Sequence, residues 1–248
     1  MPAVPPVLLL TRPEAGSRRF LEDLAAEGVT GFTAIISPLL GIEVTGPLPD
    51  LDGAGGAIFT SANAVRAYTA LGGRPLPLCY TVGDATAQAA REAGFAPRSA
   101  GGNADALVAM IRAEAPGERL VHFRGTHARG DVAARLAAAG LHAGDAVIYD
   151  QPAQELSAAA KAALDGDVPV IVPLFSPRSA AQFAGVPRGR APLIVAAMSR
   201  DVAAALGALY VTRLEIPAQP DAVDMRRVVI GLLKDFGALV KGHGSVKG

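Results

Sequence analysis

Six apolar runs along this chain each end in a small polar or basic cluster, and an Ala-rich helical pattern follows each cluster directly. These strand-to-helix junctions lie in residues 8–19, 57–68, 80–94, 120–136, 170–183 and 193–206. Strands and helices repeated in this order predict an α/β fold with parallel sheets. The carboxyl ends of parallel strands share one edge of a sheet, so free backbone N–H groups and the positive ends of helix dipoles gather there. The sequence therefore predicts edges that suit anions.

Composition limits how such an anion is recognised. Half of the 248 residues are hydrophobic, which is enough for one large domain or two small ones. Lys plus Arg equals Asp plus Glu at 23 each, so no overall charge attracts a nucleic acid or an anionic membrane. We expect neither as a partner, and we expect the anion to be recognised by local groups.

Cysteine content and the first residues predict the compartment. Cys79 is the single cysteine, which excludes an internal disulfide and a multi-thiolate metal site, and inert packing is its expected role. The opening MPAVPPVLLLTRPE has no basic segment, and its apolar run is too short for a signal peptide or a membrane span. We therefore expect a soluble cytoplasmic protein.

Two breaks divide the chain into three pieces. The first unit is predicted as a strand at Val7–Thr11, a helix near Glu14–Glu27 and a strand near Phe32–Ser37. Breaks follow near 38–52, where Pro, Asp and Gly accumulate, and near 150–156, after the apolar run AVIYDQ. They separate a short N-terminal piece from a middle block and a C-terminal block.

The common nucleotide and hydrolase motifs are absent from the sequence. No GxGxxG follows a strand, and GAGG at 53–56 is expected to precede its strand, which argues against dinucleotide binding. The P-loop and the GxSxG elbow are also missing. His122 and His127 have no third imidazole or thiol nearby, so we interpret them as a strand and a loop histidine and expect no metal site.

Small polar and basic side chains at the junctions remain as candidates for binding. Hydroxyls in such places are often ordinary helix N-caps, whereas an arginine fork also suits a carboxylate bidentately. The candidates are Thr11, Arg12, Thr60, Ser61, Asn63, Gly83, Thr86, Arg124, Thr126, Arg129, Ser176, Arg178, Ser199 and Arg200. Shared chemistry at so many junctions favours a ligand with several acidic groups over one small anion.

Taken in order, short segments of this chain resemble the uroporphyrinogen-III synthase family along nearly its whole length. The segments are LLLTRPE, PLLGIEV, IFTSANAV, VGDATAQAAREAGF, GGNADALVAMI, LVHFRG with ARGDVAARLAAAG, VIYDQ and LFSPRSAAQFA. The resemblance implies two flavodoxin-like α/β domains with parallel sheets, joined by a two-stranded linker. It implies a discontinuous first domain, 1–38 with 152–248, an inserted second domain at 39–151, and linkers near 38–45 and 147–156.

The resemblance also implies an activity. The family's substrate is hydroxymethylbilane, a linear tetrapyrrole with acetate and propionate side chains. Ring closure inverts ring D through a spiro-type intermediate, with loss of water, and makes the enzyme a cyclising hydro-lyase of tetrapyrrole biosynthesis. No metal or organic cofactor is expected, and the expected state is a monomer. The sequence leaves open whether hydroxymethylbilane synthase hands the substrate over in a transient contact.

Three positions take their expected roles from the same resemblance. Tyr149, in VIYDQ, matches the tyrosine proposed to help the hydroxyl leave, although packing beside the linker is an equal alternative. Asn103, in GGNADALVAMI, joins the binding candidates. Ser199 keeps a small polar side chain where Arg200–Val202 replace the family's Pro and Thr. We expect Arg200 to substitute for the missing Thr, and Asp201 to cap the helix or pair with an arginine.

Two functional classes remain open on the sequence alone. The first is this synthase, with catalysis distributed over many binding groups, because no convergent His, Cys or carboxylate pair stands at the junctions. The second is a non-catalytic, two-lobed protein that binds a small anion.

Overall fold

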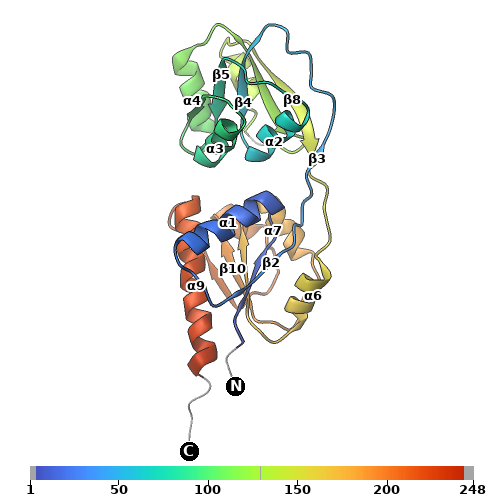
Figure 1. Ribbon diagram of the computed structural model, residues 1–248, viewed down its shortest axis with the longest axis vertical. Coiled ribbons are helices and arrows are strands. Elements are labelled where there is room, and N and C mark those ends of the chain that lie inside the picture. The colour runs from blue at the N-terminus through green and yellow to red at the C-terminus, as the bar shows by residue number, and fades with distance from the viewer. Residues whose placement is uncertain (1–3, 129, 243–248) are drawn as a thin grey trace, which may run out of the picture. The chain divides into compact units, whose positions relative to one another are not determined.

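The computed structural model describes residues 4–128 and 130–242, and the chain divides into two compact units. The first unit is made of Met1–Gly41 and Ala153–Gly248, and the second of Ile42–Pro152. Each unit has its own sheet with helices on both faces (Figure 1). The predicted α/β class with parallel sheets is confirmed. In the described residues, no helix is long and apolar enough to cross a membrane.

The first unit has a five-stranded sheet in the order β11-β10-β9-β1-β2, and all its strand pairs are parallel. This order matches flavodoxin-type doubly wound sheets, in which the connections diverge between the first strand and its neighbour, here β1 and β9. The strands are β1 (Val7–Leu10), β2 (Thr33–Ile36), β9 (Val170–Leu174), β10 (Leu193–Ala197) and β11 (Arg213–Glu215). The helices are α1 (Glu14–Ala26), α6 (Ala158–Asp165), α7 (Pro177–Ala184), α8 (Arg200–Ala204) and α9 (Ala222–Gly242).

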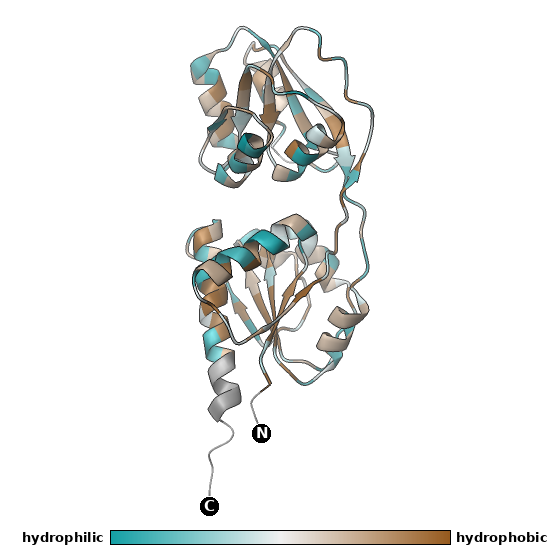
Figure 2. Ribbon diagram, in the orientation of Figure 1, coloured by the Kyte–Doolittle hydropathy of each residue, from teal (hydrophilic) through white to brown (hydrophobic). Residues whose placement is uncertain are grey.

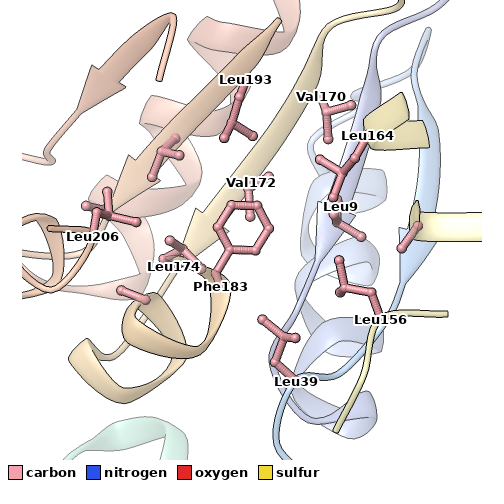
Figure 3. Packing of buried hydrophobic residues seen from close by; sticks show 14 of the residues in the cluster. Leu9, Leu39, Leu156, Leu164, Val170, Val172, Leu174, Phe183, Leu193 and Leu206 are labelled. Carbon is pink, nitrogen blue, oxygen red and sulfur yellow. The ribbon is translucent and has the colours of Figure 1, made fainter. Parts of the chain in front are cut away.

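Alternating side chains of these strands build two cores in the first unit. Leu9 and Val172 face a cluster that includes Phe183 of α7 and residues of α6 and α8 (Figure 3). Leu8 and Ile171 point to the opposite cluster, which α1 and α9 cover. The sheet is therefore buried on both faces, as its unbroken apolar strands require.

The second unit has a six-stranded sheet in the order β3-β8-β7-β4-β5-β6. Among the described strands of this unit, only the short β3 runs antiparallel, and the connections diverge between β4 and β7. The strands are β3 (Glu43–Val44), β4 (Ala54–Phe59), β5 (Leu78–Thr81), β6 (Pro97–Ser99), β7 (Arg119–Gly125) and β8 (Ala143–Asp150). The helices are α2 (Ala62–Ala70), α3 (Asp84–Glu92), α4 (Ala104–Glu114) and α5 (Val132–Ala138).

Helices α2 and α3 cover one face of this sheet, and α4 and α5 cover the other. Tyr68 of α2 packs on Phe123 of β7 with ring centroids 4.5 Å apart. Cys79 lies buried in the same cluster, which agrees with inert packing, and burial raises the pKa of its thiol to about 12. The second unit thus has a core of its own.

Element boundaries agree with the sequence patterns to within a few residues, with one correction. Helix α1 ends beside Gly28, whose φ of +72° favours glycine. The expectation that GAGG precedes its strand is wrong, because β4 begins at Ala54. A Cβ on Gly56 would stand 2.5 Å from Leu120 Cδ2, so close packing between strands explains this glycine. Most strands are coloured as hydrophobic in Figure 2, whereas α1 alternates along its length.

Candidate functional site

Thr11 and Arg12 follow β1 in the first unit, and Ser176 and Arg178 follow β9. These are the two neighbouring strands at which the connections diverge, where α/β sheets bind ligands. The guanidinium carbon of Arg12 lies 4.2 Å above the ring centroid of Phe175, so contact across the two strand ends holds the arginine. Thr11 is only 1% exposed, so its side chain belongs to the core.

Ser176 is the N-cap of α7. Its hydroxyl oxygen accepts a hydrogen bond from the backbone N–H of Ser179 at 3.1 Å, and the two hydroxyls are 2.9 Å apart. Arg178 lies half-buried in the first turn of the same helix. Ser176 is therefore an ordinary N-cap, and Arg178 places a positive charge beside it at the N-terminus of the helix.

Ser199 caps the short helix α8, accepting a hydrogen bond from the backbone N–H of Val202 at 3.4 Å. Arg200 is exposed beside it, and both residues line a hollow together with Ile216. The expectation for Asp201 is wrong, because it is exposed and forms no cap and no ion pair with a described residue. Ser199 performs the capping instead, since its extended backbone at the N-cap points its oxygen at the first turn.

The second unit presents similar caps at the ends of β4 and β6. Ser61 accepts a hydrogen bond from the backbone N–H of Asn63 at 3.1 Å, and the Asn63 side-chain oxygen accepts one from Arg66 at 3.4 Å. Asn103 caps α4 by accepting from the backbone N–H of Ala106 at 2.8 Å. Each cap uses an acceptor oxygen of its side chain, and the Ser61 hydroxyl also contacts Tyr149.

Gly83 and Thr86 mark the start of α3. A Cβ on Gly83 would lie 3.5 Å from the Gly102 Cα, an ordinary contact, so the structure does not demand a glycine there. Thr86 is 6% exposed and turns inward. Like Thr11, it offers little of its side chain to solvent, so these two candidates are the least suited to contact a ligand.

Tyr149, near the end of β8, lies against Gly125 and is 5% exposed. Burial raises the pKa of its phenol, while hydrogen bonds with Ser61 and the Gly125 backbone act in the opposite direction. The phenol therefore stays protonated at neutral pH. Tyr149 packs in a hydrophobic cluster and also reaches a polar strand end, and its role in the departure of the hydroxyl stays a prediction.

A hydrogen-bonded line of side chains runs across the neighbouring strands β4, β7 and β8. Thr60 Oγ1 lies 3.0 Å from His122 Nε2, and His122 Nδ1 lies 2.9 Å from Asp145 Oδ1. Arg124 Nε approaches the same carboxylate oxygen at 3.2 Å. His122 itself is 1% exposed. Burial, the largest cause, and Arg124 lower its pKa, and Asp145 acts in the opposite direction.

The sequence did not predict this line of side chains. The line contradicts the expectation that no convergent His, Cys or carboxylate pair stands at the junctions. A convergent His–carboxylate pair does stand beside a junction, at Thr60. The available signal was the position of His122 inside the apolar run LVHFRG, because a buried strand histidine needs partners for both ring nitrogens. Asp145 gave no comparable signal, since it lies in a separate segment of the sequence.

Two groups of predicted residues come together, one in each unit, whereas Gly83, Thr86, Asn103, Ser199 and Arg200 lie at the starts of α3, α4 and α8. Thr60, Ser61, Arg124 and Tyr149 share the ends of β4, β7 and β8. Arg12, Ser176 and Arg178 share the ends of β1 and β9 in the other unit. The candidate Arg129 lies outside the described residues. Within the described part of the chain, no group of three or more His, Cys, Asp or Glu side chains could hold a metal ion.

Known proteins resemble this chain in sequence pattern and in fold. The family described as uroporphyrinogen-III synthase HemD matches residues 22–226. No curated protein matches the sequence. The uroporphyrinogen-III synthetase of Helicobacter pylori superposes with a TM-score of 0.62 at 14% identity, over 92% of this chain and 99% of that one. A mutant uroporphyrinogen III synthase of Thermus thermophilus superposes with a TM-score of 0.50 at 16% identity, over 95% and 99%.

Proposed function

Because this chain belongs to the uroporphyrinogen-III synthase family and so works in tetrapyrrole biosynthesis, we propose that it converts hydroxymethylbilane into uroporphyrinogen III. The proposal includes inversion of ring D through a spiro-type intermediate and assignment as a cyclising hydro-lyase. It also includes a cytoplasmic monomer that takes up its substrate free or in transient contact with hydroxymethylbilane synthase. The family match favours this enzyme over the non-catalytic anion-binding alternative.

The observation that carries the proposal is the kind of group at the strand ends. Ser61, Ser176 and Ser199 each accept a backbone N–H through the hydroxyl oxygen, and the O–H of Ser199 can still donate to a ligand. Each stands at the positive end of a helix dipole, where a carboxylate is stabilised by about 0.3–1 kcal/mol. A substrate with acetates and propionates on every ring offers a partner for each such donor. Binding of this kind needs no large net positive charge.

Positioning supplies most of the catalysis in this proposal. Hydroxymethylbilane ionises readily, and unguided closure joins its ends without rearrangement to give the type I isomer. Groups that hold the carboxylates fix the bilane in one shape, so that the substituted carbon of ring D attacks first. Correct orientation alone is worth several kcal/mol, up to about 7–11 for well-aligned reactants.

Tyr149 assists the departure of the hydroxyl. Its phenol is protonated and donates a hydrogen bond to the leaving oxygen as the C–O bond breaks. The hydroxyl leaves as water, and the proton lost from a pyrrole carbon at closure balances the proton taken up. A phenol is a weak acid, so its contribution is smaller than that of positioning.

The proposed function is tested by product analysis. Hydroxymethylbilane generated enzymatically is supplied to the protein, and the type I and type III uroporphyrinogens are separated after oxidation. An excess of type III over a reaction without protein is the expected result. Type I alone, from a protein that is folded by circular dichroism, contradicts the proposal.

A further inference from the structure

The side chains of Thr60, His122 and Asp145 form a line with a defined direction of hydrogen bonding. Strand register explains why they meet, because His122 of β7 stands opposite Ile58 of β4 and opposite Asp145 of β8. Thr60 directly follows β4, so the line ends at the carboxyl edge between β4 and β7. That edge is the place at which the connections of this sheet diverge.

Each proton in this line can be assigned from its partners. A carboxylate only accepts hydrogen bonds, and Asp145 Oδ1 also lies 3.2 Å from Arg124 Nε, which can only donate. His122 Nδ1 therefore carries the proton that it donates to Asp145. The pKa of His122 is lowered by burial, so the ring is neutral near pH 7 and Nε2 is an acceptor. Thr60 must then donate its hydroxyl proton to Nε2.

The direction of the Thr60 hydrogen bond is thus opposite to that of the capping Ser199. Ser199 uses an acceptor lone pair internally and keeps its proton for a ligand, whereas the hydroxyls of Ser61 and Ser176 also contact Tyr149 and Ser179. Thr60 uses its proton internally, so its partly buried hydroxyl oxygen can only accept a further hydrogen bond. A carboxylate placed there would meet lone pairs, whereas an N–H donor would find an acceptor.

We propose that Thr60 accepts a hydrogen bond from a pyrrole N–H of the bilane, and that His122 and Asp145 are positioning residues that hold the Thr60 hydrogen bond in this direction. The inference rests on the proposed function and removes Thr60 from the set of carboxylate contacts. Loss of the hydroxyl draws electron density from a pyrrole nitrogen, so its N–H becomes a stronger donor as the C–O bond breaks. An oxygen acceptor therefore stabilises the transition state more than the bound substrate.

The first test measures the proton on His122 and does not depend on activity. Two-bond ¹H–¹⁵N correlations of the histidine-labelled protein report which ring nitrogen is protonated. We expect the Nδ1–H form with unprotonated Nε2 at neutral pH, and the same form in Asp145→Asn, whose amide oxygen still accepts. In Asp145→Leu this preference should be lost. A protonated Nε2 in the unsubstituted protein overturns the proposal.

The second test identifies the group that faces Thr60. Thr60→Val keeps the shape and removes the oxygen, and it should lower kcat for type III product about tenfold, the range of one hydrogen bond, with a smaller effect on KM. Thr60→Ser should restore most of the rate. Thr69→Val is the matched control, because the Thr69 hydroxyl only donates to Val65 within α2.

Substrates that lack one carboxylate distinguish a pyrrole N–H contact at Thr60 from a carboxylate contact. Bilanes that each lack one carboxylate are compared in the unsubstituted protein and in Thr60→Val. If Thr60 faces an N–H, the tenfold loss persists with every trimmed bilane. If the loss disappears with one of them, Thr60 contacts that carboxylate and the proposal is overturned. If the unsubstituted protein still forms type III product in that series, the proposed function stands even when the Thr60 proposal fails. Failure of the one can therefore be distinguished from failure of the other.

Discussion

The ring of Tyr149 lies directly against Gly125 at the carboxyl edge of the second sheet. A Cβ on Gly125 would stand 2.7 Å from Tyr149 Cζ and 3.1 Å from its hydroxyl oxygen. The glycine is therefore needed for the space that the phenol occupies. The position of Tyr149 beside Ser61 depends on this missing side chain.

Gly125→Ala should displace the phenol and lower the rate of type III formation at least tenfold. Overpacking of this kind also costs about 1–3 kcal/mol of unfolding free energy, which urea denaturation measures. Gly144→Ala in β8 is the control, since nothing lies within 4 Å of an added Cβ there. Equal activity of Gly125→Ala and Gly144→Ala would contradict the assigned role of the Tyr149 position.

Tyr149→Phe should slow type III formation by about ten- to a hundredfold without abolishing it, because a general acid contributes only part of the rate enhancement. Since burial raises the pKa of this phenol above its ordinary value, the unsubstituted enzyme should show no loss of rate from Tyr149 ionisation around neutral pH. Single-turnover rates across pH measure both effects. Complete loss of type III product in a folded Tyr149→Phe protein would replace distributed catalysis by a single-residue mechanism.

Ser176 allows capping to be separated from carboxylate binding. Ser176→Ala loses the N-cap of α7 and should cost about 1 kcal/mol of stability, with a several-fold loss of activity. Ser176→Asp keeps a good N-cap but adds a negative charge that repels substrate carboxylates. We expect near-unchanged stability and at least a tenfold rise in KM for the aspartate variant. An unchanged KM would remove Ser176 from the binding set.

His122 should make the folding stability depend on pH. Burial, opposed by Asp145 on β8 and assisted by Arg124 on β7, lowers its pKa in the folded state. The unfolded chain therefore binds more protons between the folded-state pKa and the ordinary value of about 6.5, and stability falls as pH drops through that window. The slope is at most about 1.4 kcal/mol per pH unit.

Urea denaturation between about pH 5 and 8 measures this dependence. His122→Gln should flatten the curve in that range, because no imidazole is then left to take up a proton on unfolding. His142→Gln is the control, since His142 is exposed and outside the line of buried partners. A curve that keeps its full slope in His122→Gln would assign the dependence to other groups.

Local patterns were enough to predict much of the molecule. Helix starts at Ser61, Ser176 and Ser199 follow from short polar side chains placed where apolar runs end, and each capping bond spans two or three residues. The α/β class follows from the same repetition. The role of Asp201 was mispredicted because two polar side chains compete for one cap, and backbone geometry favours Ser199.

Only the tertiary structure decided which strand ends lie next to one another. Thr60, His122 and Asp145 lie 62 and 23 residues apart in the sequence, and parallel strand register alone brings them into one line. Tyr149 reaches Ser61 for the same reason, across strands that the sequence does not order. Helix caps and strand periods arise from neighbours along the chain, so the sequence by itself determined them. The direction of the Thr60 hydrogen bond arises from distant partners in a buried sheet, so folding decides what that residue offers to a ligand.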